Sequence, residues 1–392
     1  MTSCARRNFN AFLSLALLLC AAAGQATPLY SKDDFKIDFS GYIQEQWLDS
    51  GDFLGASFDL FQTRLRPVFD FNFGKGFSAE VSQTLLFSSG NALDNPLYKL
   101  SQDAAPPTYF RWDKRLVNDN EAWLDWSVYR AWAAYENDKM KVTLGRQRIA
   151  FGSALFYSPL DVFNPVSPLS LEPGERVGVD GVDCEIELGP SSYFSLAYGI
   201  GNVIDQSRFA AYYKTTVKTT DLHFLAARIF ADWIAGAAFA SNVKQGKLYG
   251  EASYTWPEQG KNYFRGTIGY QYNFSNGLLL TTEYYHNDGV IHASALGLAD
   301  ASAIFTQTNA LATVDRNFLG VSAGFDLTEL IRFNSALLLD LDAGSFYIGP
   351  SFSFSAPHSI ALEAGAQLFS GNGKGDFGLL PDFDWARIRW DF

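Results

Sequence analysis

Apolar and polar side chains alternate with a period of two along most of this chain, and residues 382–392 show the pattern most clearly. Read as a strand, this segment has an apolar face that consists of Ala386, Ile388, Trp390 and Phe392. Its other face is charged and consists of Trp385, Arg387, Arg389 and Asp391. Successive side chains of a strand point to opposite sides. Such a strand suits a membrane barrel whose apolar face meets lipid and whose arginines meet a watery lumen. An edge strand of a soluble β-sandwich is the alternative.

The same alternation predicts further strands. Together with the last segment there are seventeen, at residues 35–47, 61–73, 77–87, 123–135, 139–149, 182–188, 193–200, 222–230, 233–243, 248–256, 264–274, 278–286, 317–327, 331–341, 346–354, 360–369 and 382–392. Barrels of this kind have an even number of strands. Counting upward and downward strands from both ends puts the missing one between residues 200 and 222, where residues 209–217 can supply it. We therefore predict an all-β, closed antiparallel transmembrane barrel with 18 strands, with 16 as the alternative.

Composition agrees with a strand-rich chain. Aromatic residues make up 16% of the sequence, with 34 Phe and 19 Tyr against only 2 Met. Aromatic and β-branched residues favour strands. After the first 26 residues no run of 18 apolar residues occurs, so the sequence predicts no transmembrane helix.

Residues 1–26 have the features of a secretory signal peptide. Arg6 and Arg7 precede an apolar stretch at residues 12–23, and Gly24-Gln25-Ala26 forms a cleavage site with small residues. A lipoprotein signal at Cys20 is disfavoured because Leu19, just before it, is not small. We expect export to the cell outer membrane, with residues 27–392 forming a single barrel domain.

Charge and cysteine content narrow the function further. The formal net charge is −12, and the leader carries two arginines and no acid. A nucleic-acid partner is excluded on this basis, because phosphate binding needs a basic surface. Cys184 is the only cysteine outside the leader, so no intramolecular disulfide is predicted.

The segment at residues 151–175 breaks the alternation. Pro159, Pro165, Pro168 and Pro173 rule out a regular strand or a long helix. The segment is nevertheless too apolar for a solvated surface loop, so we predict that it folds into the barrel and constricts it. Its candidate constriction residues are Asp161, Phe163, Asn164, Pro165, Glu172 and Glu175.

Two parts of the sequence resemble known proteins. The run Leu144-Gly145-Arg146-Gln147-Arg148-Ile149, then Phe151-Gly152 and Asp161-Val162-Phe163-Asn164-Pro165, resembles the signature of a family of bacterial outer-membrane porins that is similar to the alginate-export porins. The resemblance covers residues 144–183. The C-terminal Phe392, with Ile388 and Trp390, resembles the signature that the barrel-assembly machinery reads, and implies insertion by that machinery. Some similar barrels enclose multihaem cytochromes, so the resemblance leaves the function open.

No catalytic pattern is found. The sequence contains no Gly-x-Ser-x-Gly and no Cys-x-x-Cys-His, and its four histidines are scattered. The glycine-rich run at residues 371–376 lacks the strand-to-helix context of a phosphate loop. We predict that the protein is not an enzyme and has no metal or other cofactor.

Charged residues on the inward phase of the strands are the remaining candidates for function. The predicted basic lining consists of Arg64, Arg66, Arg146, Arg148, Arg387 and Arg389. Arg146 and Arg148 share a phase with apolar residues, so a bulge at Gly145 is expected to redirect them. The predicted acidic lining, on the opposite side, consists of Glu185, Glu187, Glu251, Glu283, Asp340 and Glu363. The two linings either create a transverse field that orients dipolar solutes or are simply solvated.

The sequence thus predicts a passive outer-membrane channel for small hydrophilic solutes, in contact with lipid and narrowed by residues 151–175. Two alternatives remain. One is a sheath around a multihaem cytochrome, and the other is an export channel for an anionic polysaccharide, which would need a mostly basic lumen.

Overall fold

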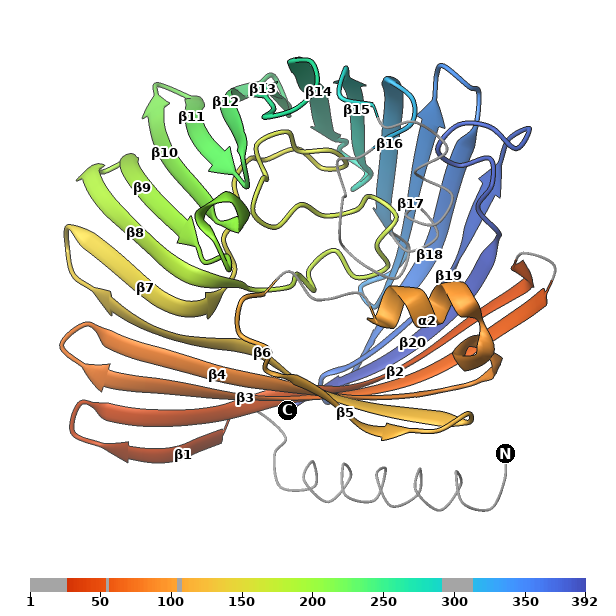
Figure 1. Ribbon diagram of the computed structural model, residues 1–392, viewed down its shortest axis with the longest axis horizontal. Helices are drawn as coiled ribbons and strands as arrows, with labels where there is room; N and C mark the ends of the chain where they lie inside the picture. Colours follow the sequence, from red (N-terminus) through yellow and green to blue (C-terminus); the bar gives the residue numbers. More distant parts are fainter. Residues whose placement is uncertain (1–26, 54–55, 104–107, 291–312) are drawn as a thin grey trace.

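A computed structural model describes residues 27–53, 56–103, 108–290 and 313–392. Within these residues one antiparallel sheet closes on itself (Figure 1). The closed wall contains eighteen strands: β2 (Phe35–Phe53), β3 (Ala56–Gly74), β4 (Phe77–Ser89), β6 (Ala122–Glu136), β7 (Met140–Gln147), β8 (Val179–Gly189), β9 (Ser192–Gly199), β10 (Arg208–Val217), β11 (Thr220–Ile229), β12 (Asp232–Val243), β13 (Gly246–Trp256), β14 (Tyr263–Asn273), β15 (Leu279–Asn287), β16 (Asn317–Asp326), β17 (Ile331–Asp340), β18 (Phe346–Ala356), β19 (Ile360–Ser370) and β20 (Phe383–Asp391). The predicted 18-stranded barrel is confirmed, including the inferred strand β10. The predicted leader lies outside the described residues.

Two further strands pair with strands of the closed wall. β1 (Thr27–Lys32) pairs with the start of β2, and β5 (Asp113–Asn118) pairs with β6. Between β4 and β5 the chain forms a short 3-10 helix, η1 (Asn91–Asp94), and the helix α2 (Pro96–Asp103). The alternation predicts no element between residues 87 and 123. Asn95 begins α2, because its side-chain oxygen accepts the Tyr98 N–H at 3.2 Å and Pro96 suits the first helical position.

Another 3-10 helix, η2 (Ile204–Gln206), lies between β9 and β10. In the part of the chain that the structure describes, no helix has the length and apolar character needed to cross a bilayer.

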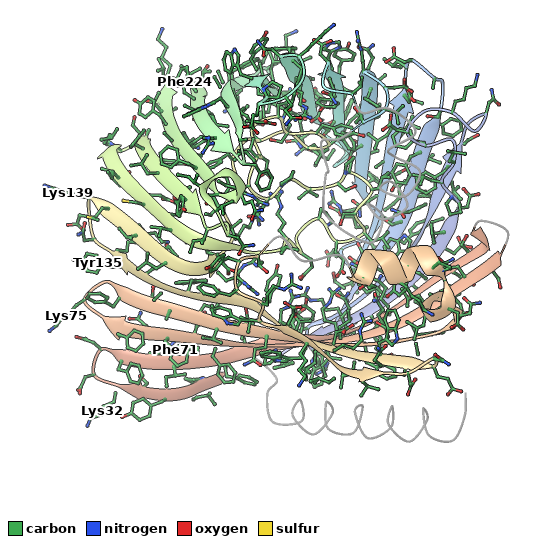
Figure 2. The ribbon with its side chains drawn as sticks, in the orientation of Figure 1. Lys32, Phe71, Lys75, Tyr135, Lys139 and Phe224 are labelled. Atoms are coloured by element: carbon green, nitrogen blue, oxygen red, sulfur yellow. The ribbon has the colours of Figure 1, made fainter. Side chains whose placement is uncertain are left out.

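Tight turns join the strands at one end of the barrel. Lys75, between Gly74 and Gly76, has a positive φ of 50° and turns β3 into β4. Lys32, Lys75 and Lys139 lie at this end of their strands (Figure 2). The rings of Phe77 and Tyr135, close to the same turns, are 4.7 Å apart. Aromatic rings followed by lysines are typical of the boundary between lipid and water.

The barrel closes where β20 meets β2. Gly41 and Phe392 exchange two main-chain hydrogen bonds of 2.9 Å, and the Phe392 ring packs with Leu65. A Cβ atom at Gly41 would lie 2.3 Å from the Arg66 carbonyl oxygen and 2.9 Å from the Phe392 ring. The closure therefore depends on a residue without a side chain at position 41.

The expected bulge at Gly145 is absent. Gly145 pairs in regular register with Trp132 of β6 and with Gly181 of β8. A Cβ atom at this position would lie 2.2 Å from the Ala131 carbonyl oxygen, and φ is +118°. Close approach of the neighbouring main chain, rather than an inserted residue, explains the glycine.

Candidate functional site

The irregular segment between β7 and β8, residues 148–178, lies inside the ring of strands (Figure 1). We call it the lumen loop. Phe151, Leu160 and Phe163 are buried in one apolar cluster with inward residues of β8 to β12, such as Leu225. A second cluster is formed by Phe156, Tyr157 and Leu169 with inward residues of β15 to β18 and with Phe377. The prediction of an inward-folded loop is confirmed, and burial of its apolar side chains explains why it leaves the solvent.

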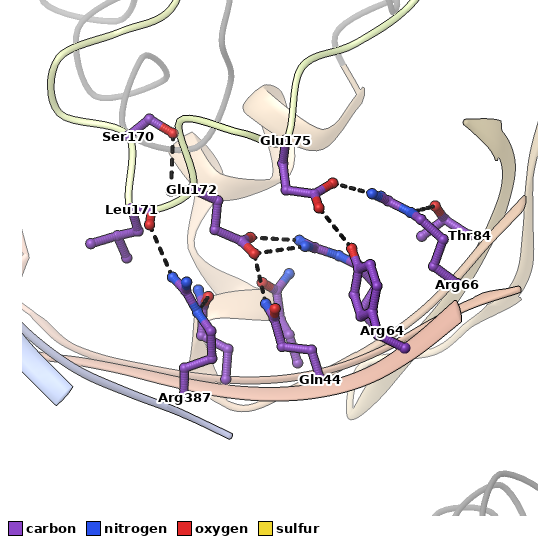
Figure 3. A network of polar contacts seen from close by, with 12 residues as sticks. Gln44, Arg64, Arg66, Thr84, Ser170, Leu171, Glu172, Glu175 and Arg387 are labelled. Atoms are coloured by element: carbon purple, nitrogen blue, oxygen red, sulfur yellow. Dashed lines mark hydrogen bonds and ion pairs between the residues drawn. The ribbon is translucent and has the colours of Figure 1, made fainter. Parts of the chain in front are cut away.

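Two loop carboxylates bind two arginines of β3 (Figure 3). Glu172 and Arg64 meet through two contacts of 2.9 Å, and Glu175 forms an ion pair with Arg66. Burial alone would raise the pKa of Glu172, but the Arg64 guanidinium and its hydrogen bonds outweigh burial and lower that pKa to about 2. The pKa of Glu175 is lowered in the same way, mainly by Arg66. Both carboxylates are therefore charged over the whole neutral range.

Neighbouring side chains extend this attachment. Gln44 donates to Glu172 at 2.8 Å and the Tyr42 hydroxyl donates to Glu175 at 2.9 Å. Arg387 of β20 donates to the Leu171 carbonyl oxygen at 3.1 Å. Arg64 and Arg387 pair with the flanking β2 residues Gln44 and Gln46, so the arginines of β3 and β20 lie close together.

The far wall holds the loop with carboxylates of its own. Glu283 of β15 accepts N–H bonds from Leu155 at 2.8 Å and from Phe156 and Tyr157 at 3.0 Å. Glu251 of β13 accepts the Ala154 N–H and the Ser158 hydroxyl, both at 2.7 Å.

β13 lies nine strands from β3 in either direction around the wall, so the loop is attached to diametrically opposite strands. Alternation placed Glu251 and Glu283 in the lumen but gave no sign of their main-chain partners. Both are almost fully buried, and a role of either in lining the pore stays a prediction.

Within the loop, Asp161 and Asn164 organise the main chain. Asn164 accepts the Ile149 N–H at 3.0 Å and donates to the Val177 carbonyl oxygen at 2.5 Å, which joins the two ends of the loop. Asp161 accepts from Arg176 at 2.6 Å. Burial raises the pKa of Asp161 to about 7 despite this guanidinium. The Phe163 carbonyl oxygen accepts from Arg208 at 2.8 Å, and Pro165 is half-buried.

Arg146 and Arg148 have different environments. Arg146 is 4% exposed and binds Asp180 through contacts of 2.8 and 3.0 Å. It also donates to the carbonyl oxygens of Phe110 and Val128. Arg148 is exposed and makes no ion pair within the described ranges. Asp180 is not among the predicted site residues, because only the pairing of β7 with β8 brings it opposite Arg146.

The other predicted acids do not form one wall opposite the arginines. Glu363 forms a 2.8 Å ion pair with Arg387 on the neighbouring strand, which corrects its expected position. Glu185 and Glu187 lie near the β8–β9 turn, and Glu187 is exposed. Arg389 forms an ion pair with Asp391 and lies over the Tyr42 ring at 3.9 Å.

Charge instead changes along the strands of the β2–β4 sector. Asp38, Asp70 and Glu80 are direct cross-strand neighbours on β2, β3 and β4. They lie closer to the short turns than Arg64 and Arg66, which are on the same face of β3. The arginines and the carboxylates therefore lie at different heights along this wall.

One acidic group could hold a cation. Among the described residues, Asp315, Asp340 and Asp376 place one carboxylate oxygen each within 4.8 Å of one another, and oxygen ligands are those that Ca²⁺ prefers. These carboxylates already accept hydrogen bonds, including Ser345 Oγ to Asp340 at 2.9 Å and Asp315 N to Asp376 at 3.0 Å. Asp340 also accepts the Asp376 N–H at 3.3 Å and so links its own turn to the loop after β19, and its role in the pore lining stays a prediction.

The closed 18-stranded wall with a loop folded into it is the architecture of outer-membrane channel barrels. Solved structures with this fold include Acinetobacter baumannii OccAB3, with a TM-score of 0.55 and 10% identity over 91% of this chain and 99% of that chain. Pseudomonas aeruginosa OccK5 (OpdH) gives a TM-score of 0.58 and 7% identity over 91% and 97%. Pseudomonas aeruginosa OccK3 (OpdO) gives 0.56 and 9% over 90% and 95%.

At these identities the similarity establishes the fold alone. No family model and no curated protein matches the sequence. The resemblance of residues 144–183 to the alginate-export type of porin therefore stays a prediction.

Proposed function

We propose that the protein is a passive outer-membrane channel for small hydrophilic solutes, narrowed by the lumen loop. The observation that carries the proposal is the attachment of this loop to opposite strands, to Arg64 and Arg66 on β3 and to Glu251 and Glu283 on β13 and β15. A segment held on both sides of a lumen narrows the passage and stays in place while solutes pass. Lipid then surrounds the wall, and the barrel-assembly machinery inserts it through the strand that ends in Ile388, Trp390 and Phe392.

The two alternatives have less support. A sheath for a multihaem cytochrome needs an open interior, whereas here the loop packs against inward residues of β8 to β12 and of β15 to β18. An export channel for an anionic polysaccharide needs an excess of positive charge. Arg64, Arg66 and Arg387 are each paired with a carboxylate, which removes most of that excess.

Single-channel recording of the purified full-length protein in planar bilayers tests the proposal. We expect steady conductance steps, and swelling of proteoliposomes in sugars with a cut-off by size. A correctly folded barrel that gives neither conductance nor swelling would overturn it. Solute uptake that appears only after addition of a cytochrome partner would favour the sheath.

A further inference from the structure

We propose that Glu251 and Glu283 are the residues that set the position of the constriction, by binding the main chain of the lumen loop. This inference rests on the proposed function and adds to it the residues that determine the width of the channel on the β13–β15 side. It assigns a task to two carboxylates that would otherwise count as pore charges.

Glu283 acts on three consecutive residues. Its two oxygens accept the N–H groups of Leu155, Phe156 and Tyr157, and its side chain is 2% exposed. The Tyr249 hydroxyl donates to the same carboxylate at 2.9 Å and holds it from the wall side. These loop N–H groups belong to no helix or strand and so lack the acceptors that regular structure provides, and Glu283 supplies acceptors in their place.

Glu251 binds the loop residues just before and after those three. The N–H groups of Ser153 and Ala154 and the Ser158 hydroxyl donate to its carboxylate. The loop approaches so closely that a Cβ atom at Gly152 would lie 2.8 Å from both oxygens. Gly152 also has a φ of +84°, which favours glycine. Together the two carboxylates bind all five N–H groups from Ser153 to Tyr157.

The Thr267 hydroxyl adds one directional bond from the wall, to the Tyr157 carbonyl oxygen at 2.7 Å, but the other contacts of this segment do not fix its path in the same way. Packing of Phe156 and Leu160 is non-directional and tolerates sliding of the chain. The ion pairs of Glu172 and Glu175 act on the other half of the loop. Hydrogen bonds to consecutive N–H groups are directional, so they determine which main-chain atoms face the wall.

A carboxylate is the side chain that this task requires. It has two oxygens, accepts several bonds and carries no donor. Glutamine has nearly the same shape, but one of its two groups is an NH₂ donor that would face the loop N–H groups. Glu283→Gln and Glu251→Gln therefore test the role with little change in volume.

The experiment compares these variants in the full chain with Glu329→Gln, which removes the same charge from an exposed site in the turn between β16 and β17. A folded barrel is recognised by its heat-modifiable mobility on gels. Loop position is read from the rate at which a water-soluble thiol reagent modifies Ala154→Cys, introduced together with Cys184→Ala. Channel width is read from single-channel conductance.

We expect modification about tenfold faster in Glu283→Gln and Glu251→Gln, which corresponds to about 1.4 kcal/mol. Their conductance should become larger and fluctuate, while the conductance of Glu329→Gln matches that of the parent. A modification rate and a conductance equal to those of the parent in both variants would overturn the inference. Should the Gln variants not fold, Glu283→Asp and Glu251→Asp decide, because they keep the charge but shorten the side chain. Faster modification in them supports the inference, and an unchanged rate refutes it.

The two proposals fail separately. A parent protein that is folded but silent in bilayers overturns the channel function, and the thiol rates still decide whether the two carboxylates position the loop.

Discussion

Arg64 and Glu172 face each other through two parallel contacts of 2.9 Å, although 108 residues separate them in the sequence. Both side chains are largely buried, at 16% and 14% exposure. A two-pronged arginine–carboxylate pair is directional as well as charged. It attaches the second half of the lumen loop to β3 in one orientation.

We expect this pair to show strong energetic coupling. Glu172→Gln and Arg64→Gln should each destabilise the barrel, and the double variant should lose less than the sum. Coupling between contacting charged residues is about 0.5–3 kcal/mol. Denaturant unfolding in detergent micelles, followed by tryptophan fluorescence, measures the free energies of the four chains. Strictly additive losses would show that the pair makes no net contribution.

The attachment of the loop should depend on pH in two opposite ways. The folded-state pKa of Glu172, about 2, is below its ordinary value of 4.5, so its stabilisation is complete above pH 4.5 and is lost as the pH falls toward 2. Asp161 has a folded-state pKa of about 7, above its ordinary value of 3.8. The folded chain therefore holds a proton there between these values, and stability rises as the pH falls from 7 toward 4.

Unfolding midpoints at pH 8, 5.5 and 3 should thus be highest at pH 5.5. Asp161→Asn should remove the difference between pH 8 and 5.5 and keep the loss at pH 3. Glu172→Gln should do the reverse. An Asp161→Asn chain with the parent's full pH profile would contradict the assignment.

The buried pair of Arg146 and Asp180 should be costly to break. Asp180→Asn leaves the Arg146 guanidinium without its counter-ion at 4% exposure, which is expected to cost about 3–5 kcal/mol. The matched control is Asp125→Asn, because its partner Arg115 and Asp125 itself are 22% and 29% exposed. That change is expected to cost no more than about 1 kcal/mol. Unfolding free energies that do not differ between the two variants would contradict the prediction.

Closure of the barrel should be sensitive to one methyl group. Gly41→Ala places a Cβ atom against the Arg66 carbonyl oxygen and the Phe392 ring, and overpacking of this kind costs about 1–3 kcal/mol. Gly51→Ala, on the same strand, meets no atom within 4 Å and serves as the control. The fraction of heat-modifiable, folded protein after refolding into detergent should fall for the first variant alone.

The wall was predictable because period-two alternation is a local property. Strand β10 shows how far the pattern reaches: Phe209 and Tyr213 alternate with polar or small residues too weakly to define a strand, and the even-number rule was needed to include it. β1, β5 and α2 were missed. β1 and β5 have six residues each and form hairpins with the next strands, β2 and β6, so their alternation is too short to define a strand. α2 begins at an Asn95-Pro96 cap inside a stretch that looked irregular.

The lumen loop was predictable in its location and not in its attachments. Prolines and apolar residues indicated a packed, irregular segment. Glu251 and Glu283 bind N–H groups, which every residue except proline possesses, so no side-chain pattern in the loop identifies them as partners. The arrangement of charge was also mistaken, because alternation reports which side chains point inward and contains no information on their height in the barrel.

The meeting of β2 with β20 has a consequence for biogenesis. Arg387 donates to Gln46 across this junction, and 341 residues separate the two in the sequence. Until the last strand arrives, the free margin of β2 exposes unpaired main-chain groups that could recruit any passing segment and start aggregation. We infer that the margin of β2 stays open until the last strand pairs with it, so the wall needs protection from association with other chains until its final residues are in place.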